Sequence, residues 1–179
     1  DGPGALAVFM GGAVGTETDG RSLGLARHDE VMGDLTSSFA FLKEQDGQPQ
    51  ALVNIRHPRG LGQPEIEKLL NERAALFAKR SGVPITVSVK IYTEPHLAAV
   101  DGKVVSSLLA VWQEVTGTPG KPVAIGGGTQ ARLFTGGVDF GPAQIAEHYR
   151  GHGPDEYMTV SELKRVAELT IAAVWKLAR

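Results

Sequence analysis

The sequence contains no cysteine among its 179 residues, so disulfide bonds and thiolate metal sites are both excluded. It also lacks an excess of charge of one sign, since 18 Lys and Arg residues face 20 Asp and Glu residues. A near-neutral chain without a basic segment argues against nucleic acid or a membrane surface as a partner. No apolar run approaches the roughly 18 residues of a transmembrane helix. These absences favour a cytoplasmic protein that binds neither nucleic acid nor membrane.

The composition still allows a folded core, because 42% of the residues are hydrophobic. The length suits one medium domain or two small ones. The first residues include neither an initiator Met nor the charged start of a signal peptide. We therefore expect the chain to be a piece of a longer protein.

Residues 34–56 carry the pattern of a β-hairpin. Apolar and polar residues alternate on both sides of an Asp46-Gly47 turn, as is typical of half-buried strands. One face of the first strand is expected to carry Leu35, Phe39 and Phe41. In the second strand one face is expected to carry Ala51, Val53 and Ile55, and the other Leu52, Asn54 and Arg56.

Helices and a further strand are expected on either side of this hairpin. A short helix over residues 5–10 precedes it, and a helix that starts near Pro64 and stops at Gly82 follows it. Residues 83–92 alternate again and predict a strand with one face made of Ile85, Val87, Val89 and Ile91. The order is that of a ferredoxin-like βαββαβ unit without its first strand, and we assign it to residues 1–95.

Residues 96–179 predict the edge of a layered α/β domain. Asp101 can cap a helix that ends at Gly117, short strands are expected at 121–125 and 137–141, and Thr159 with Glu162 forms a capping box for the last helix. The expected inner face of the last helix consists of Leu163, Val166, Thr170, Ala173, Val174 and Leu177.

His152 is a candidate metal ligand in the stretch "GHGPDEYM", residues 151–158. Imidazole is the commonest side-chain ligand for zinc, and flanking glycines let the backbone turn the ring toward a metal. One histidine is not a site, because zinc takes three or four protein ligands. A general base and a solvated loop histidine remain open alternatives, and His148 competes for the metal role.

Two other features can bind an anion. Gly127, Gly128 and Thr129 belong to a "GGGT" stretch whose successive N–H groups can hold an anion, although a tight turn explains it equally well. It is no phosphate loop, because no lysine follows the threonine. Arg56 lies on a strand face, where a guanidinium can clamp a carboxylate or can simply be solvated.

Together, the segments "HDEVMGDLT", "NIRHP", "EPH", "AIGGGTQAR", "GVDFGP" and "HGPDEYM" resemble the C-terminal part of the PepV-like dipeptidases. These belong to the aminoacylase/carboxypeptidase family of two-zinc metallopeptidases. The likeness runs from about Leu23 to the end of the chain. In such enzymes a ferredoxin-like lid interrupts an α/β catalytic domain. The resemblance implies that residues 1–95 are a partial lid and 96–179 the C-terminal segment of the catalytic domain.

The resemblance also implies roles for single residues. In such enzymes two zinc ions bridge a water or hydroxide, and a glutamate acts as the base. His152 matches a zinc ligand, and Arg56 matches the lid arginine that holds the carboxylate of a dipeptide substrate. Gly127, Gly128 and Thr129 match the loop that lines the substrate cleft.

The sequence departs from the family pattern in three ways. It has no His-x-Asp pair, no Glu-Glu pair and no upstream lid histidine. It therefore holds at most one ligand for two zinc ions and no catalytic residue. We expect the chain alone to be inactive and to require the remaining N-terminal part of the catalytic domain. The alternative is a non-catalytic ferredoxin-like binding or dimerisation module.

Overall fold

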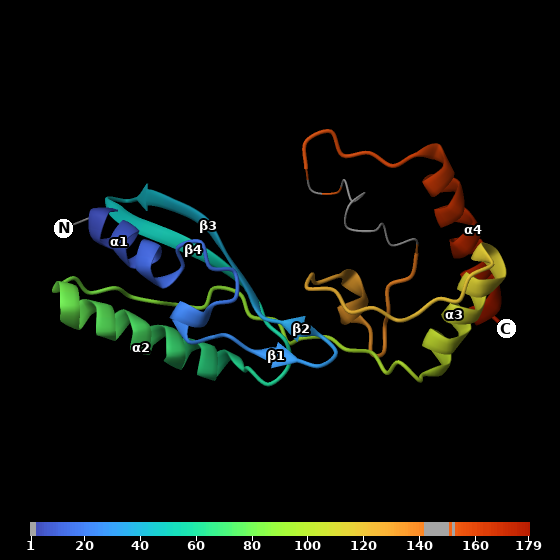
Figure 1. Cartoon of the computed structure of the whole chain (residues 1–179), viewed down its shortest axis with the longest axis horizontal. Helices are drawn as coiled ribbons and strands as arrows, with labels where there is room; N and C mark the ends of the chain where they lie inside the picture. The colour runs from blue at the N-terminus through green and yellow to red at the C-terminus, as the bar shows by residue number, and fades with distance from the viewer. Residues whose placement is uncertain (1–2, 142–150, 152) are drawn as a thin grey trace. The chain divides into compact units, whose positions relative to one another are not determined.

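The computed structural model describes residues 3–141, 151 and 153–179, and these form two compact units (Figure 1). The first unit consists of Asp1–His96 and Ala124–Gly128, and the second of Leu97–Val123 and Thr129–Arg179. The described residues contain four α-helices and two antiparallel two-stranded sheets. This is an α+β architecture, as the sequence predicts.

The predicted hairpin is present in the first unit as β3 (Thr36–Gln45) and β4 (Gln48–Arg56). Asp46 and Gly47 connect the strands with φ angles of 54° and 71°. Positive φ at both central residues gives a turn whose twist matches that of the strands. The side chains of β4 alternate as predicted, with three packed against the core: Ala51, Val53 and Ile55.

A register shift in β3 overturns one predicted face. Phe39 pairs with Val53, whereas Phe41 pairs with Leu52, so one extra residue lies between them on β3. Residues directly opposite each other share a face, which places Phe39 on the inner face and Phe41 on the outer one. The extra residue reverses the alternation, so Phe41 does not share a face with Leu35 as predicted.

One helix lies against β4 of the hairpin, and a second helix packs against the first. α1 (Pro3–Ala13) contacts β4 and α2 (Gln63–Ser81), and the rings of Phe9 and Phe77 meet edge to face at 5.1 Å. Contrary to prediction, α1 continues through Gly11. A helical glycine costs only about 0.5–1 kcal/mol, and burial of Met10 and Ala13 offsets that cost. α2 ends at Gly82 with φ 73°, as expected.

Residues 83–92 do not form the predicted strand. Their side chains still alternate between half-buried and exposed, and Ile85, Val89 and Tyr92 pack against the core. Among the described residues no strand is hydrogen-bonded to them, and a ladder needs a neighbour. Periodicity therefore predicted the buried side correctly at Ile85, Val87 and Val89 but not at Ile91, which is 87% exposed, and it did not predict the pairing. The predicted strands at 121–125 and 137–141 are also absent for want of a partner.

Three short elements lie between α1 and β3 in the chain. The 3-10 helix η1 (Arg21–Leu23) is followed by β1 (His28–Asp29) and β2 (Gly33–Asp34), which pair with each other. Leu25 and Leu35 lie on either side of this small ribbon and are almost fully buried. They anchor it to the core of the first unit.

The second unit contains α3 (Lys103–Thr116) and α4 (Val160–Leu177), which pack together, and the 3-10 helix η2 (Gln130–Leu133). Gly102 rather than Asp101 is the N-cap of α3, so that predicted cap is wrong. The capping box at the start of α4 is confirmed. No helix within the described ranges is long and apolar enough to cross a membrane.

The buried face of α4 differs from the predicted one. Leu169 and Ala173 pack against Leu108 and Val111 of α3. The exposed residues of α4 include four that were predicted to face inward: Leu163, Thr170, Val174 and Leu177. The helix has apolar residues on two sides, and periodicity alone does not say which side meets α3.

Candidate functional site

Arg56 is the last residue of β4 and lies on the outer face of the hairpin, opposite Thr36. Its Nη1 donates to the main-chain oxygen of Gly126 over 3.3 Å. The two residues are 70 positions apart in the chain but belong to the same compact unit. The structure thus brings the candidate carboxylate clamp and the glycine stretch together.

The glycine stretch lies within the short segment that returns to the first unit, Ala124–Gly128. A Cβ added to Gly127 would lie 3.7 Å from Nη1 of Arg56, which is ordinary van der Waals contact. A small side chain would therefore fit at Gly127, and the bond from Arg56 to the Gly126 carbonyl defines the site. Gly128 follows in the same segment.

Thr129 falls in the second unit, and its hydroxyl donates to the carboxylate of Asp139. This hydrogen bond therefore joins two residues of the second unit. In the structure Arg56 lies next to Gly126 and Gly127. The described hydrogen bond of Thr129 is made to Asp139 instead.

The hydrogen bonding of Arg56 leaves it able to bind an anion. Among the described residues, the guanidinium groups of Arg21, Arg27 and Arg59 donate to carboxylates, whereas that of Arg56 donates to a carbonyl. A guanidinium has five N–H donors, and its planar fork matches a carboxylate. One long, exposed bond to Gly126 orients the group and leaves donors for a ligand.

The segment after Arg56 is held in place by two contacts. The His57 ring stacks on Tyr92, with ring centroids 5.4 Å apart and an interplanar angle of 21°. Arg59 donates from Nε and Nη2 to Oδ2 of Asp29 over 2.9 and 2.7 Å. These contacts fix the strand end that carries Arg56.

Asp29 is the centre of the small β1–β2 ribbon, and its importance was missed from the sequence. Its Oδ1 accepts from the main-chain N–H groups of Val31 and Met32, both at 2.8 Å. These bonds and the Arg59 guanidinium lower the pKa of the Asp29 carboxyl to about 2. The spacing of Asp29 and Met32 in the chain is a signal for a local turn, but no local signal indicates Arg59, which is 30 residues away.

His28 belongs to β1 of this ribbon, and its ring pairs with a carboxylate of β2. Its Nδ1 is 2.7 Å from Oδ1 of Asp34, its partner in the β1–β2 register. The hydrogen bond to that carboxylate raises the pKa of the imidazole. Both side chains are exposed, so the pair adds little to stability at ordinary salt.

The predicted zinc ligand His152 and its competitor His148 lie outside the described residues. Within the described residues no group of three or more His, Asp or Glu side chains can hold a metal ion. These residues do not by themselves fit a zinc ion.

A comparison with known proteins finds dipeptidases similar to this chain. It is 34% identical over 161 residues to the "Beta-Ala-Xaa dipeptidase" of Lactobacillus delbrueckii subsp. lactis, a match that covers 89% of this chain. It is 29% identical over 164 residues to "Putative dipeptidase YtjP" of Bacillus subtilis (strain 168), which covers 91% of this chain. No family model matches the chain.

These matches cover only part of each relative. The chain spans about one third of their length, 33% of the first and 34% of the second. Homology to proteins named dipeptidases thus extends over nearly the whole chain and supports a dipeptidase family.

Proposed function

We propose that this chain is part of a dipeptidase and that Arg56 binds the carboxylate of its substrate. The observation that carries the proposal is the contact between Arg56 and the carbonyl of Gly126. It joins the two segments that the sequence singled out for anion binding. Homology to proteins named dipeptidases supports the reaction class.

The chemistry of a dipeptide suits such a clamp. Its free carboxylate lies next to the only peptide bond, so a guanidinium that holds the carboxylate also fixes the position of that bond. The relative from Lactobacillus delbrueckii is named for β-Ala-Xaa dipeptides, whose Xaa residue carries this carboxylate. The carbonyl of Gly126 orients the guanidinium for this role.

We further propose that the enzyme is a cytoplasmic, zinc-dependent hydrolase of the PepV-like kind. When bound, zinc would supply a Lewis acid for peptide hydrolysis. His152, Gly128 and Thr129 keep their proposed roles as zinc ligand and cleft residues. Most ligands and the catalytic glutamate would come from residues outside this chain, so the chain alone would be inactive. A non-catalytic module is not favoured, because the relatives carry dipeptidase names.

The test uses the full-length protein that contains these residues, assayed with a dipeptide and with the corresponding dipeptide amide. Arg56→Ala should lower kcat/KM for the dipeptide by about 10- to 150-fold, the loss of a charge-assisted interaction of about 1.5–3 kcal/mol. The amide lacks the carboxylate, so the variant should cleave it as slowly as the wild type does. Arg56→Lys should recover only part of the loss, because lysine lacks the fork.

Arg80→Ala is the matched control, since Arg80 is an exposed arginine in the last turn of α2. It should leave both rates unchanged. If Arg56→Ala lowered kcat/KM equally for the dipeptide and for its amide, Arg56 would not bind the substrate carboxylate. Full activity after metal removal by a chelator would contradict the zinc requirement.

A further inference from the structure

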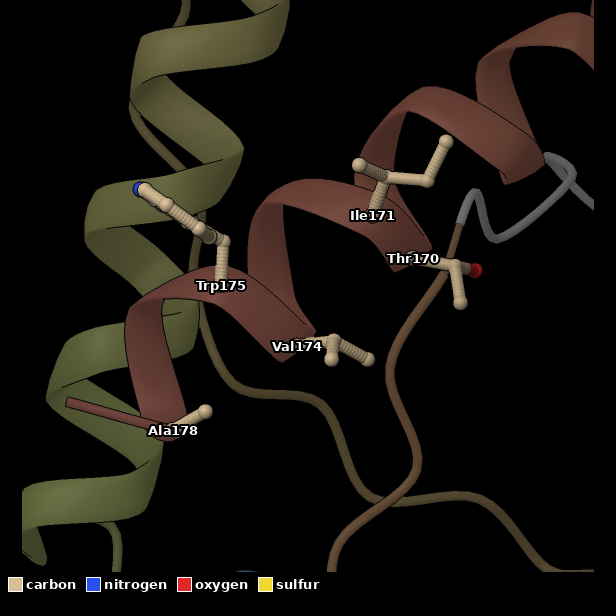
Figure 2. A pocket seen from close by; sticks show the side chains of 5 residues that line it. All are labelled: Thr170, Ile171, Val174, Trp175 and Ala178. Carbon is tan, nitrogen blue, oxygen red and sulfur yellow. The ribbon is translucent and has the colours of Figure 1, made fainter.

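The hollow on α4 is apolar, whereas the group that Arg56 is proposed to bind is a carboxylate. Figure 2 shows the five side chains that line this hollow: Thr170, Ile171, Val174, Trp175 and Ala178. The Thr170 hydroxyl donates to the carbonyl of Val166 in its own helix. Charged contacts that can support carboxylate binding lie instead in the first unit, around Arg56 and Asp29.

Asp29 is a charged residue with a largely enclosed side chain. The side chain is only 13% exposed, and carboxylates are rarely buried unless they are paired. Its Oδ1 accepts from the main-chain N–H groups of Val31 and Met32, and its Oδ2 accepts from Nε and Nη2 of Arg59. These four bonds match the roughly four lone-pair sites of a carboxylate. Asp29 therefore ties its own turn to a residue 30 positions away.

The bond between Asp29 and Arg59 closes a ring of contacts that contains Arg56. In one direction the chain runs from Asp29 through β2 and the buried Leu35 to Thr36, which lies opposite Arg56 in the hairpin. In the other direction the chain runs from Arg56 to Arg59, which returns to Asp29. Closing a chain segment into a ring removes much of its conformational freedom. The ring therefore restricts the backbone at Arg56.

The Arg56 side chain depends on such a restriction. Its described bond to the Gly126 carbonyl is 3.3 Å long, beyond the usual range of about 2.7–3.2 Å. Arginine has a long side chain with many rotamers, so one weak bond places it well only when its backbone is already fixed. A shift of about 1 Å in a group that positions substrate can lower the rate about 100-fold.

We propose that Asp29 is a positioning residue for carboxylate binding: through Arg59 it holds the end of β4, and with it Arg56, in the geometry that binds the substrate carboxylate. The proposal rests on the proposed function of Arg56. Asp29 acts through the strand end and contacts no substrate. Its effect should therefore be confined to substrates that carry a free carboxylate.

Asp29→Asn in the full-length protein breaks the link to Arg59 and spares the local turn. Asparagine keeps an oxygen that can accept from Val31 and Met32, but it has no charge for the guanidinium. kcat/KM for the dipeptide should fall about tenfold, whereas that for the dipeptide amide should change by less than about twofold. Arg59→Ala should give the same pattern. Arg59→Lys should recover part of the loss, because lysine keeps the charge without the fork.

The Arg56→Ala background shows whether Asp29 acts through Arg56. In that background Asp29→Asn should lower kcat/KM for the dipeptide by less than about twofold further, because the residue it positions is gone. Asp19→Asn is the matched control. Asp19 also accepts from Nε and the main-chain N–H of an arginine, but that arginine is Arg21, two residues away. The control should leave the ratio of the two substrate rates unchanged.

A structural role would give a different result, because a smaller folded fraction lowers the rates for the dipeptide and the amide equally. Equal losses after Asp29→Asn, or no loss, would overturn the proposal. A tenfold loss that persists in the Arg56→Ala background would also overturn it. If Arg56→Ala itself left the ratio unchanged, the proposed function would fall. If Arg56→Ala changed the ratio and Asp29→Asn did not, only the positioning role would fall.

Discussion

Replacing Leu169 by alanine tests which side of α4 carries the stability of the second unit. Leu169 is fully buried against α3, at 0% exposure, whereas Val174 is 63% exposed. Leucine-to-alanine changes in cores cost about 2–5 kcal/mol. The core here is small and can relax, so we expect about 2–3 kcal/mol for Leu169→Ala. Val174→Ala should cost less than about 1 kcal/mol, because most of its surface already meets solvent.

Tryptophan fluorescence during urea unfolding measures this difference cleanly. The chain contains two tryptophans, Trp112 and Trp175, and both lie in the second unit. The signal therefore reports the unfolding of that unit without interference from the first. A larger loss of stability from Val174→Ala than from Leu169→Ala would refute the packing of α3 on α4 and favour the face predicted from the sequence.

Three further predictions concern the first unit. The folded-state pKa of Asp29 is about 2, below the ordinary 3.8, so its stabilising effect is complete above pH 4 and is lost as the pH falls toward 2; the NMR shift of the Val31 amide should titrate with that midpoint. The folded-state pKa of His28 is raised, so its contribution to the free energy of unfolding is complete below pH 6.5. That contribution is lost as the pH rises through the raised pKa of the folded state. Asp34→Asn should lower the midpoint of the imidazole resonance, and an unchanged midpoint would contradict the pairing. Gly20→Ala should destabilise the protein by about 1–3 kcal/mol in thermal unfolding, because Gly20 has φ 67° and a Cβ there would lie 3.0 Å from the Leu35 side chain; an unchanged Tm would contradict this close packing.

Features encoded by neighbouring residues were predictable. The hairpin followed from alternation around Asp46 and Gly47, and α2 from its first-turn Pro64 and terminal Gly82. The capping box of α4 needs only residues three apart. In each case the deciding interaction lies within a few residues, so the local sequence contains the necessary information.

Features that depend on distant residues were not predictable. The alternation of residues 83–89 showed which side chains face the core, but a strand also needs a partner for its N–H and C=O groups. The shift between Phe39 and Phe41 arises in pairing with β4, and pairing registers do not show in one strand alone.

The candidate site divides in the same way. The sequence by itself determined that Arg56 lies on a strand face and that the glycines can approach a ligand, because both depend on residue type and local pattern. Only the tertiary structure decided that Arg56 contacts Gly126, 70 residues on, and that Asp29 binds Arg59 across 30 residues. It also decided which apolar side of α4 meets α3. Such contacts form when the folded core brings distant segments together, and no spacing along the chain specifies them.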